Sequence, residues 1–342
     1  MMMMAATLAM ASVLSLLFVL LDTQASLVPQ IVIISVAGVL AIVSPLVFLL
    51  TRSPYSFVIA VIGFRGTGKT VFLTSLFDRL MASEVPGFDF APYGVETLDE
   101  VTKNLDCLAS GNWLPSTKSE DIYHFRAQAV SGRGLFARRF KLEIGDYPGE
   151  SSSELAEGSG KRLHRSDYFK DVVQSDAVFL VVGCDSLVDA DAEQLAHEEN
   201  ALIAALNYLK EMKGVRVGRR MRAPLVVVVT KSDVIGNAEQ EWEAVSAAAK
   251  QALTEKMQRL VGQAQKSCIA YSCHAVSAAG HVGSDGSPPT KLAGLGVAAP
   301  VRWALGRLAV DHGSSAFPLA RRVKRRDERK TDPTDSQDTQ KK

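Results

Sequence analysis

The first 50 residues contain two apolar runs, residues 5–21 and 27–50, which are separated by the polar stretch DTQAS. The second run reaches the roughly 20 apolar residues that span a bilayer as a helix. The first run is near the short limit, so it fits either the first helix of a transmembrane hairpin or the apolar core of a signal peptide. We favour the hairpin, because no Lys or Arg precedes this run and a signal peptide normally begins with a positive region.

The charge next to these runs predicts an orientation. Arg52 is the first cation in the chain, and it follows the second apolar run directly. The positive-inside rule places such a flank in the cytoplasm. We therefore expect an integral protein of the cell membrane, with everything after Arg52, including the C-terminus, on the cytoplasmic side.

Beyond Arg52 the pattern alternates between short apolar runs and amphipathic segments, which is typical of α/β domains. The expected strands are residues 57–62, 121–130, 137–145, 177–185, 224–229 and 268–278. The expected helices are residues 71–81, 95–110, 189–212, 238–263 and 301–310. The turn SGRG joins the second and third strands as a hairpin.

Composition narrows the functional classes. The 342 residues include 38 Lys and Arg against 37 Asp and Glu, so the net charge of +1 excludes a polyanion binder that works by bulk charge. With 47% apolar residues the chain can bury a large core. The four cysteines lack the paired spacing of a zinc site, and we interpret them as reduced and mostly buried.

The first candidate site is GFRGTGKT, from Gly63 to Thr70. It stands between an expected strand and an expected helix, which is the context that the G-x-x-x-x-G-K-[ST] phosphate loop requires. The glycines let backbone N–H groups turn toward phosphates at the positive end of the helix. Lys69 would reach the β and γ phosphates, and the Thr70 hydroxyl would bind Mg²⁺.

The second element is GDYPG, at the end of the strand 137–145. Asp146 is either a loop or capping residue, or a carboxylate that holds Mg²⁺ through water, and its place after the hairpin favours the metal. In the second case the Gly149 N–H would meet a γ phosphate.

The third element, TKSD, ends the buried strand 224–229. Asp233 can accept hydrogen bonds from the N1–H and the amino group of guanine, whereas adenine offers neither donor there. The stem of Lys231 would lie over the base plane, and Thr230 would brace the phosphate loop. In the last strand, backbone N–H groups near Ser277 and Ala278 would contact guanine O6.

GFRGTGKT, GDYPG, TKSD and VSA occur in the order of the Ras-like, translation-factor class of P-loop GTPases, and the chain resembles that class over residues 57–279. With its apolar N-terminus it is also similar to the β subunit of the signal-recognition-particle receptor and to bacterial double-GTPase-type proteins. The resemblance implies a mostly parallel six-stranded sheet with helices on both faces, and GTP or GDP with Mg²⁺ as ligands. The nucleotide-binding residues that it implies are Gly63, Arg65, Gly66, Thr67, Gly68, Lys69, Thr70, Val71, Thr230, Lys231, Asp233, Ser277 and Ala278.

Three positions depart from that class and bear on catalysis. The threonine that binds Mg²⁺ and the γ phosphate is best matched by Thr117, with Ser116 as a rival, and both lie beyond an insertion after Lys69. Glu150 replaces the glutamine that orients the attacking water, so it is either a base with an unfavourable charge or a solvated residue. Arg65 either points to solvent or supplies a positive charge to the phosphates in cis.

The remaining segments suggest a division of the chain. We expect a membrane anchor at 1–52, a GTPase domain at 53–279, a Gly- and Pro-rich linker with a short helix at 280–319, and a basic disordered tail at 320–342. The tail and the arginine-rich stretch GVRVGRRMRAP are open to two interpretations, as solvated segments or as contacts to anionic lipid. Nucleic acid is not an expected partner, because no aromatic residues interleave the charges.

These observations predict a membrane-anchored GTPase switch that hydrolyses GTP to GDP, with an effector or activating protein as an unidentified partner. Two alternatives remain open from the sequence. The first is a guanine-nucleotide-dependent scaffold that does not hydrolyse GTP, and the second is the ATPase component of a membrane transport or secretion assembly.

Overall fold

The computed structural model describes residues 55–82, 89–115, 123–131, 138–146, 172–236, 241–280, 287–289, 292 and 294–311. All of them belong to one unit of the chain, Pro54–Gly132 together with Arg138–Lys342. The predicted membrane hairpin and the basic tail lie outside the described residues. Among the described helices, none combines the length and the apolar composition needed to cross a bilayer.

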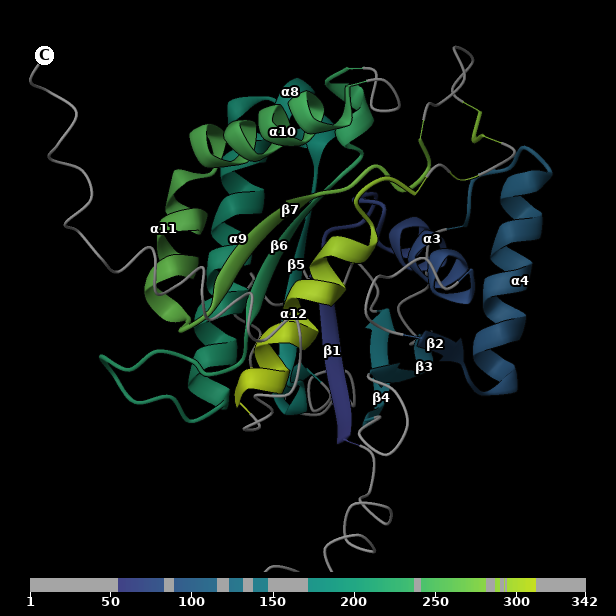
Figure 1. Cartoon of the computed structure of the whole chain (residues 1–342). Helices are drawn as coiled ribbons and strands as arrows, with labels where there is room; N and C mark the ends of the chain where they lie inside the picture. Colours follow the sequence, from purple (N-terminus) through teal and green to yellow (C-terminus); the bar gives the residue numbers. More distant parts are fainter. Residues whose placement is uncertain are drawn as a thin grey trace, which may run out of the picture. The chain divides into compact units, whose positions relative to one another are not determined.

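A seven-stranded sheet forms the centre of this unit, in the order β2-β3-β4-β1-β5-β6-β7 (Figure 1). The strands are β1 (Tyr55–Gly63), β2 (Asp89–Pro92), β3 (Tyr123–Ser131), β4 (Arg138–Asp146), β5 (Ala177–Gly183), β6 (Leu225–Thr230) and β7 (Tyr271–Ala275). All neighbouring pairs are parallel except the two that involve β3. The α/β class and the antiparallel β3–β4 pair are therefore as predicted.

The expected number of six strands was wrong, because β2 adds a seventh at the edge. This strand has four residues, DFAP, and of these only Phe90 is buried. A short strand that ends in proline suits a sheet edge, where one side of the backbone needs no partner strand. With four residues that begin with Asp and end with Pro, it is too short to stand out from a loop.

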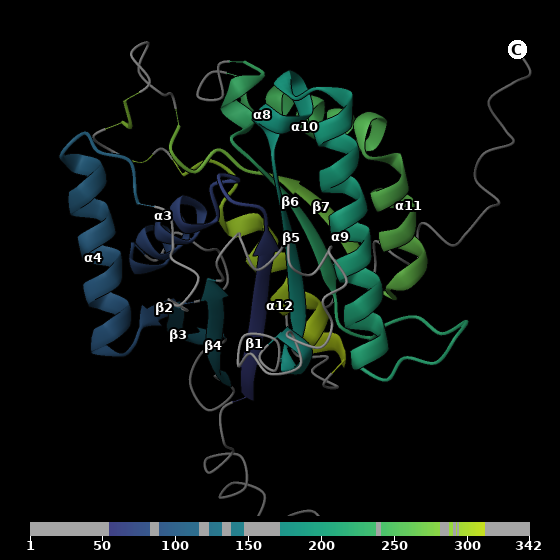
Figure 2. The same ribbon diagram turned by 180° about the vertical axis from the view of Figure 1, so that it is seen from behind.

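Helices cover both faces of the sheet, and β1 shows how the sequence divides between them. Ile59 and Val61 pack in one core cluster with α3 (Lys69–Met81) and α12 (Ala298–Asp311). Ala60 and Ile62 pack in a second cluster with α9 (Ala192–Met212), α10 (Trp242–Lys256) and α11 (Gln258–Ser267). Alternate residues of a strand point to opposite faces, so a continuous apolar run indicates a strand buried on both sides. Figure 1 shows α3 and α12 in front of the sheet. In the opposite view of Figure 2, α9 lies in front of the sheet.

Two of the expected helical segments involve an additional helix. The segment 238–263 contains α10 and α11, which are separated at the buried Met257, where φ is −121° and ψ is 52°. The segment 189–212 contains α9, which follows the short helix α8 (Cys184–Asp189). Between these two helices, the side chain of Asp191 accepts the Gln194 N–H at 2.7 Å and caps α9.

The helix expected at 95–110 is α4 (Val95–Ala109), in the insertion that follows α3. Its buried residues Thr97, Val101, Asn104 and Leu108 recur at helical spacing and form one stripe. Within this stripe the Asn104 amide donates to the Thr74 hydroxyl of α3 at 3.3 Å. The insertion is therefore packed against the helix that carries the phosphate loop.

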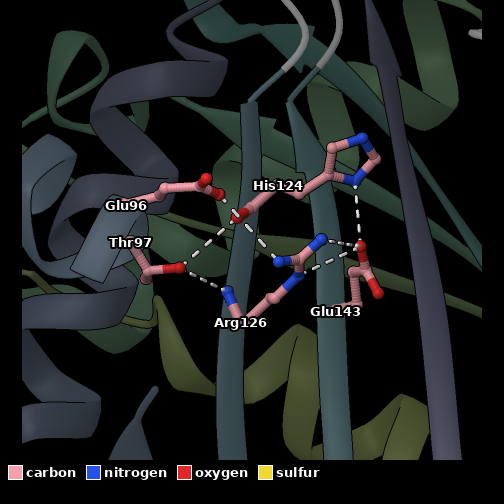
Figure 3. Close-up of polar contacts among 5 residues, drawn as sticks. All are labelled: Glu96, Thr97, His124, Arg126 and Glu143. Atoms are coloured by element: carbon pink, nitrogen blue, oxygen red, sulfur yellow. Dashed lines mark hydrogen bonds and ion pairs between the residues drawn. The ribbon is translucent and has the colours of Figure 1, made fainter. Parts of the chain in front are cut away.

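Polar contacts hold the start of α4 against β3 (Figure 3). The Thr97 hydroxyl accepts the Arg126 N–H at 3.1 Å and donates to the His124 carbonyl at 3.4 Å, so it pairs backbone groups of β3 that β2 does not reach. The Arg126 guanidinium lies 3.4 Å from the Glu143 carboxylate of β4 and 4.0 Å from that of Glu96. These contacts connect α4 to two adjacent strands.

Candidate functional site

The phosphate-loop motif joins β1 to α3 at the carboxyl end of the sheet. Gly66 and Gly68 have φ angles of 80° and 78°, in the left-handed region where side chains other than glycine are strained. The Thr67 hydroxyl donates to the Phe64 carbonyl at 2.9 Å and closes the loop. α3 begins directly after Gly68, so the first N–H groups of the helix lie at the loop, as an anion site requires.

Lys69 is buried inside this loop. Its ammonium donates to the carbonyls of Gly63 at 2.8 Å and Phe64 at 2.9 Å. Burial lowers the pKa of Lys69 to about 8, although the nearby Asp146 carboxylate acts in the opposite direction. A partly desolvated ammonium attracts phosphate more strongly than one in water, because the surrounding dielectric is lower.

Asp146 ends β4, beside the loop. Its Oδ2 accepts the Thr70 hydroxyl at 2.8 Å, whereas Oδ1 is buried without a hydrogen-bond partner among the described residues. Burial raises the pKa of Asp146 to about 6, against the attraction of Lys69 and the hydrogen bond from Thr70. A buried carboxylate oxygen without a partner is costly unless something else satisfies it.

Mg²⁺ fits these two residues. A hydroxyl and a carboxylate supply the oxygen ligands that Mg²⁺ prefers, and the unpaired Oδ1 is free to accept a metal-bound water. Within the described ranges, no group of three or more His, Cys, Asp or Glu residues forms a metal cage.

Thr230 links the phosphate loop to the third motif. Its hydroxyl lies at the end of β6, within hydrogen-bond reach of the Thr67 carbonyl at 2.5 Å and the Val182 carbonyl at 3.2 Å. Thr230 is 1% exposed, so these carbonyls replace water as its partners. The predicted brace between TKSD and the phosphate loop is present in the structure.

Lys231 and Asp233 follow directly. Lys231 has a φ angle of 53°, and its ammonium pairs with the Asp185 carboxylate at the start of α8 at 2.5 Å. The Asp233 Oδ1 accepts the Ser277 hydroxyl at 2.8 Å. Each side chain is thus held by a partner that the motif itself does not contain.

The Ser277 backbone differs from the expected arrangement. Its N–H donates to the Leu295 carbonyl at 3.0 Å, so it is not available to guanine O6 in this structure. The side chain instead orients Asp233. Of the two residues predicted in the VSA segment, only Ala278 lines the pocket between the phosphate loop and TKSD.

A pocket of about 220 Å³ connects the phosphate loop with TKSD. Gly68 and Val71 line it on the loop side, and Lys231 and Asp233 line it on the base side. Trp113, which follows α4, also lines this pocket and is 43% exposed. Sequence reasoning missed Trp113 because it belongs to the insertion, where no motif marks it. The available signal was a large aromatic residue in the stretch GNWLPSTK, close before the predicted Thr117.

The remaining predicted residues fall into two groups. Arg65 is exposed on the phosphate loop, so its predicted cis role stays a prediction. Thr117, its rival Ser116, Gly149 and Glu150 lie outside the described residues.

The chain is similar to one protein family and to several solved structures. The family model for Double-GTPase 2 matches residues 57–282. No curated protein matches the chain. Similar solved structures include the signal recognition particle receptor SRb-GTP/SRX complex from Chaetomium thermophilum, which is 17% identical with a TM-score of 0.36 and covers 69% of this chain and 95% of that one.

Two further structures are similar. The Arl6 BBS3 small GTPase from Trypanosoma brucei with bound GppNp is 14% identical, with a TM-score of 0.36, over 77% of this chain and 99% of that chain. The Ski7 GTPase-like domain from S. cerevisiae, bound to GDP and inorganic phosphate, is 16% identical, with a TM-score of 0.39, over 78% of this chain and 52% of that chain.

The mostly parallel sheet, the phosphate loop and the TKSD motif around one pocket define a P-loop domain that binds guanine nucleotide. The family match spans well over half of the chain, and the protein belongs to the Double-GTPase 2 family.

Proposed function

We propose that this protein is a membrane-anchored GTPase switch that hydrolyses GTP to GDP and inorganic phosphate. The observation that carries the proposal is the pocket in which Gly68 of the phosphate loop and Asp233 of TKSD line one continuous space. A single guanosine triphosphate would fill both ends. The Asp233 carboxylate would then accept hydrogen bonds from the base, with the stem of Lys231 over its plane.

The phosphate end would work by charge and position. Lys69 would leave its two carbonyl partners for the β and γ phosphates, while Thr70 and Asp146 would hold Mg²⁺ directly or through water. The metal would neutralise charge on the phosphate oxygens. Water would form a bond to the γ phosphorus as the bond from that phosphorus to the β–γ bridging oxygen breaks, and GDP would leave with the bonding electron pair.

Four predicted roles remain part of this proposal. Thr117 would contact Mg²⁺ and the γ phosphate, the Gly149 N–H would meet the γ phosphate, and Glu150 would lie beside the attacking water. Arg65 would supply positive charge in cis. Release of the segments around Thr117 and Gly149 after hydrolysis would change the surface that an effector or activating protein meets.

The membrane part of the proposal rests on the two apolar runs before Arg52. They would anchor the chain in the cell membrane with the nucleotide-binding unit in the cytoplasm. The second candidate function is a membrane scaffold that binds GTP without hydrolysing it. The observation that favours it is that Glu150 follows the GDYPG motif, where its negative charge would oppose the reaction of a γ phosphate.

Single-turnover hydrolysis separates the two functions. Full-length protein in phosphatidylcholine nanodiscs is loaded with γ-labelled GTP, and phosphate release is followed with and without Mg²⁺. We expect Mg²⁺-dependent release by the parent protein and no tight GTP binding by Lys69→Ala. Lys103→Ala is the matched control, because this lysine lies on α4 with 69% of its side chain exposed. Stable GTP binding without phosphate release would reject the GTPase and favour the scaffold.

A further inference from the structure

The loop between α9 and β6, residues 213–224, lies at the amino end of the sheet. β1 and β6 both belong to the parallel part of the sheet, so the start of β6 at Leu225 and the start of β1 at Tyr55 are at the same end. The phosphate loop and Asp233 follow the carboxyl ends of those strands. Figures 1 and 2 both show this loop projecting sideways from the ends of α9 and β6, in the half of the sheet where β1 begins.

A tight turn places an apolar residue at the tip of the loop. The Arg219 N–H donates to the Arg216 carbonyl at 3.0 Å, and Gly218 has a φ angle of 78°. This combination is that of a type II turn, whose third position requires a positive φ and therefore favours glycine. Val217 occupies the second position and is fully exposed, at 103% relative accessibility. An aliphatic side chain that is fully exposed at a rigid turn buries nothing within its own domain.

The loop is held firmly against the sheet. Met221 is 1% exposed; its N–H donates to the Ser267 carbonyl at 2.7 Å, and its carbonyl accepts the Ile269 N–H at 2.9 Å. Ile269, next to this contact, is 63% exposed. Two exposed aliphatic side chains thus lie at the same end of the sheet, one at the turn and one beside its base.

The same surface is strongly basic. We name it the loop face and define it as Arg216, Val217, Arg219, Arg220, Arg222 and Ile269. Its four arginines are exposed, and among the described residues none of them forms an ion pair. Lys266, three residues before Ile269, is a further exposed cation. The exposed carboxylate nearest to the loop in sequence is Glu211, in the last turn of α9. Positive charge around apolar side chains is the composition that favours an anionic membrane surface.

The chain also brings this end of the sheet to the bilayer, provided that the proposed membrane anchor is correct. The second apolar run ends at Leu50, and β1 begins at Tyr55. Five residues span at most about 18 Å when fully extended. The start of β1, which is at the same end of the sheet as the loop face, would therefore be held within about 18 Å of the second apolar run.

We infer that the loop face docks on the anionic lipid headgroups of the cytoplasmic leaflet, with Val217 and Ile269 entering the interfacial region. The arginines pair with lipid phosphates and carboxylates, and the aliphatic side chains leave water. The nucleotide pocket, at the opposite end of the sheet, then faces away from the membrane. Docking orients the switch so that the segments near the γ phosphate meet partners in the cytoplasm.

An environment-sensitive label tests this orientation in the full-length protein. Val217→Cys is labelled with the fluorophore NBD and reconstituted into vesicles of phosphatidylcholine alone or with 30% phosphatidylserine. Val188→Cys is the matched control, because Val188 is an exposed valine, 52% accessible, on α8 at the carboxyl end of the sheet. The parent chain, labelled in the same way, supplies the background from the partly exposed Cys107 and Cys273.

We expect NBD at position 217 to shift to shorter wavelength and become brighter when phosphatidylserine is present, and NBD at position 188 to stay unchanged. Replacing all four arginines by glutamine must reverse the shift, since a loss of about fivefold per cation lowers the docking equilibrium constant by about 10²–10³-fold. Binding of fluorescent GTP remains unchanged in these variants, which shows that they fold. A label at position 217 that stays in water, or that responds only to added RNA, overturns the inference.

Flotation separates this inference from the proposed anchor. If full-length protein floats with phosphatidylcholine vesicles in 1 M salt, the anchor is supported. If the label at position 217 of that protein still behaves like the label at position 188, docking is refuted. Protein that floats only with phosphatidylserine, and only when the arginines are present, refutes the anchor and supports docking. Protein that floats with neither refutes both.

Discussion

Replacing Asp146 by asparagine is expected to stabilise the nucleotide-free protein while it weakens GTP binding. The carboxylate is 0% exposed and has one oxygen without a partner among the described residues. The asparagine carbonyl can still accept the Thr70 hydroxyl, so the shape and the hydrogen bond at Oδ2 are kept. The change removes the buried negative charge that Mg²⁺ would use.

The magnitude follows from the pKa of Asp146, which burial raises from the ordinary value of 3.8 to about 6. At pH 8, where the carboxylate is ionised, this rise in pKa lowers the free energy of unfolding by about 3 kcal/mol. The folded state holds its proton to higher pH than the unfolded state, so stability falls as pH rises from about 4 to about 6 and then levels off. Asparagine has no proton to lose, and its advantage at pH 5 is about half of that at pH 8.

Thermal unfolding measures this difference. For full-length protein in nanodiscs, followed by tryptophan fluorescence at pH 8, Asp146→Asn should raise Tm by about 6–12 °C, because 1 kcal/mol shifts Tm by about 2–4 °C in a domain of this size. Asp106→Asn, at an exposed position of α4, is the matched control and should leave Tm unchanged. A lower Tm for Asp146→Asn at pH 8, or an effect that does not grow between pH 5 and pH 8, would contradict this prediction.

Three further substitutions test separate contacts. Asp233→Asn should weaken GTP binding by about 10²-fold and strengthen XTP binding, because the amide can donate to the C2 oxygen of xanthine. Equal losses of affinity for both nucleotides in a competition assay would contradict this. Trp113→Ala should weaken GTP binding by roughly tenfold and remove GTP-dependent quenching of tryptophan fluorescence, whereas unchanged affinity and quenching would place the base elsewhere. Thr97→Val should lower the free energy of unfolding by about 1–3 kcal/mol, since it leaves the Arg126 N–H unpaired, and Thr102→Val on the exposed side of α4 should not.

Much of the site could be predicted from the sequence because its motifs directly follow apolar runs. Gly63, Asp146 and Thr230 each end a strand of the parallel part of the sheet, and those ends meet at one edge. The order of the runs therefore suffices to bring Gly68 of the phosphate loop and Asp233 to one pocket, as the structure shows.

What the sequence could not predict depends on contacts between distant segments. The pairing of Lys231 with Asp185, and that of Asp233 with Ser277, involve residues 46 and 44 positions apart. Trp113 reaches the pocket because α4 packs on α3 and β3, which no local pattern reveals. The edge strand β2 was missed because four residues, of which only Phe90 is buried, are too few to carry a periodic signal.

Competition binding tests most directly whether one guanine nucleotide joins the phosphate loop to Asp233. Full-length protein in nanodiscs is saturated with fluorescent GTP, which is then displaced by unlabelled GTP or ATP in the presence of Mg²⁺. We predict displacement by GTP at concentrations at least about 10²-fold lower than by ATP, since adenine lacks both donors that face the Asp233 carboxylate. Equal displacement by the two nucleotides would contradict the account.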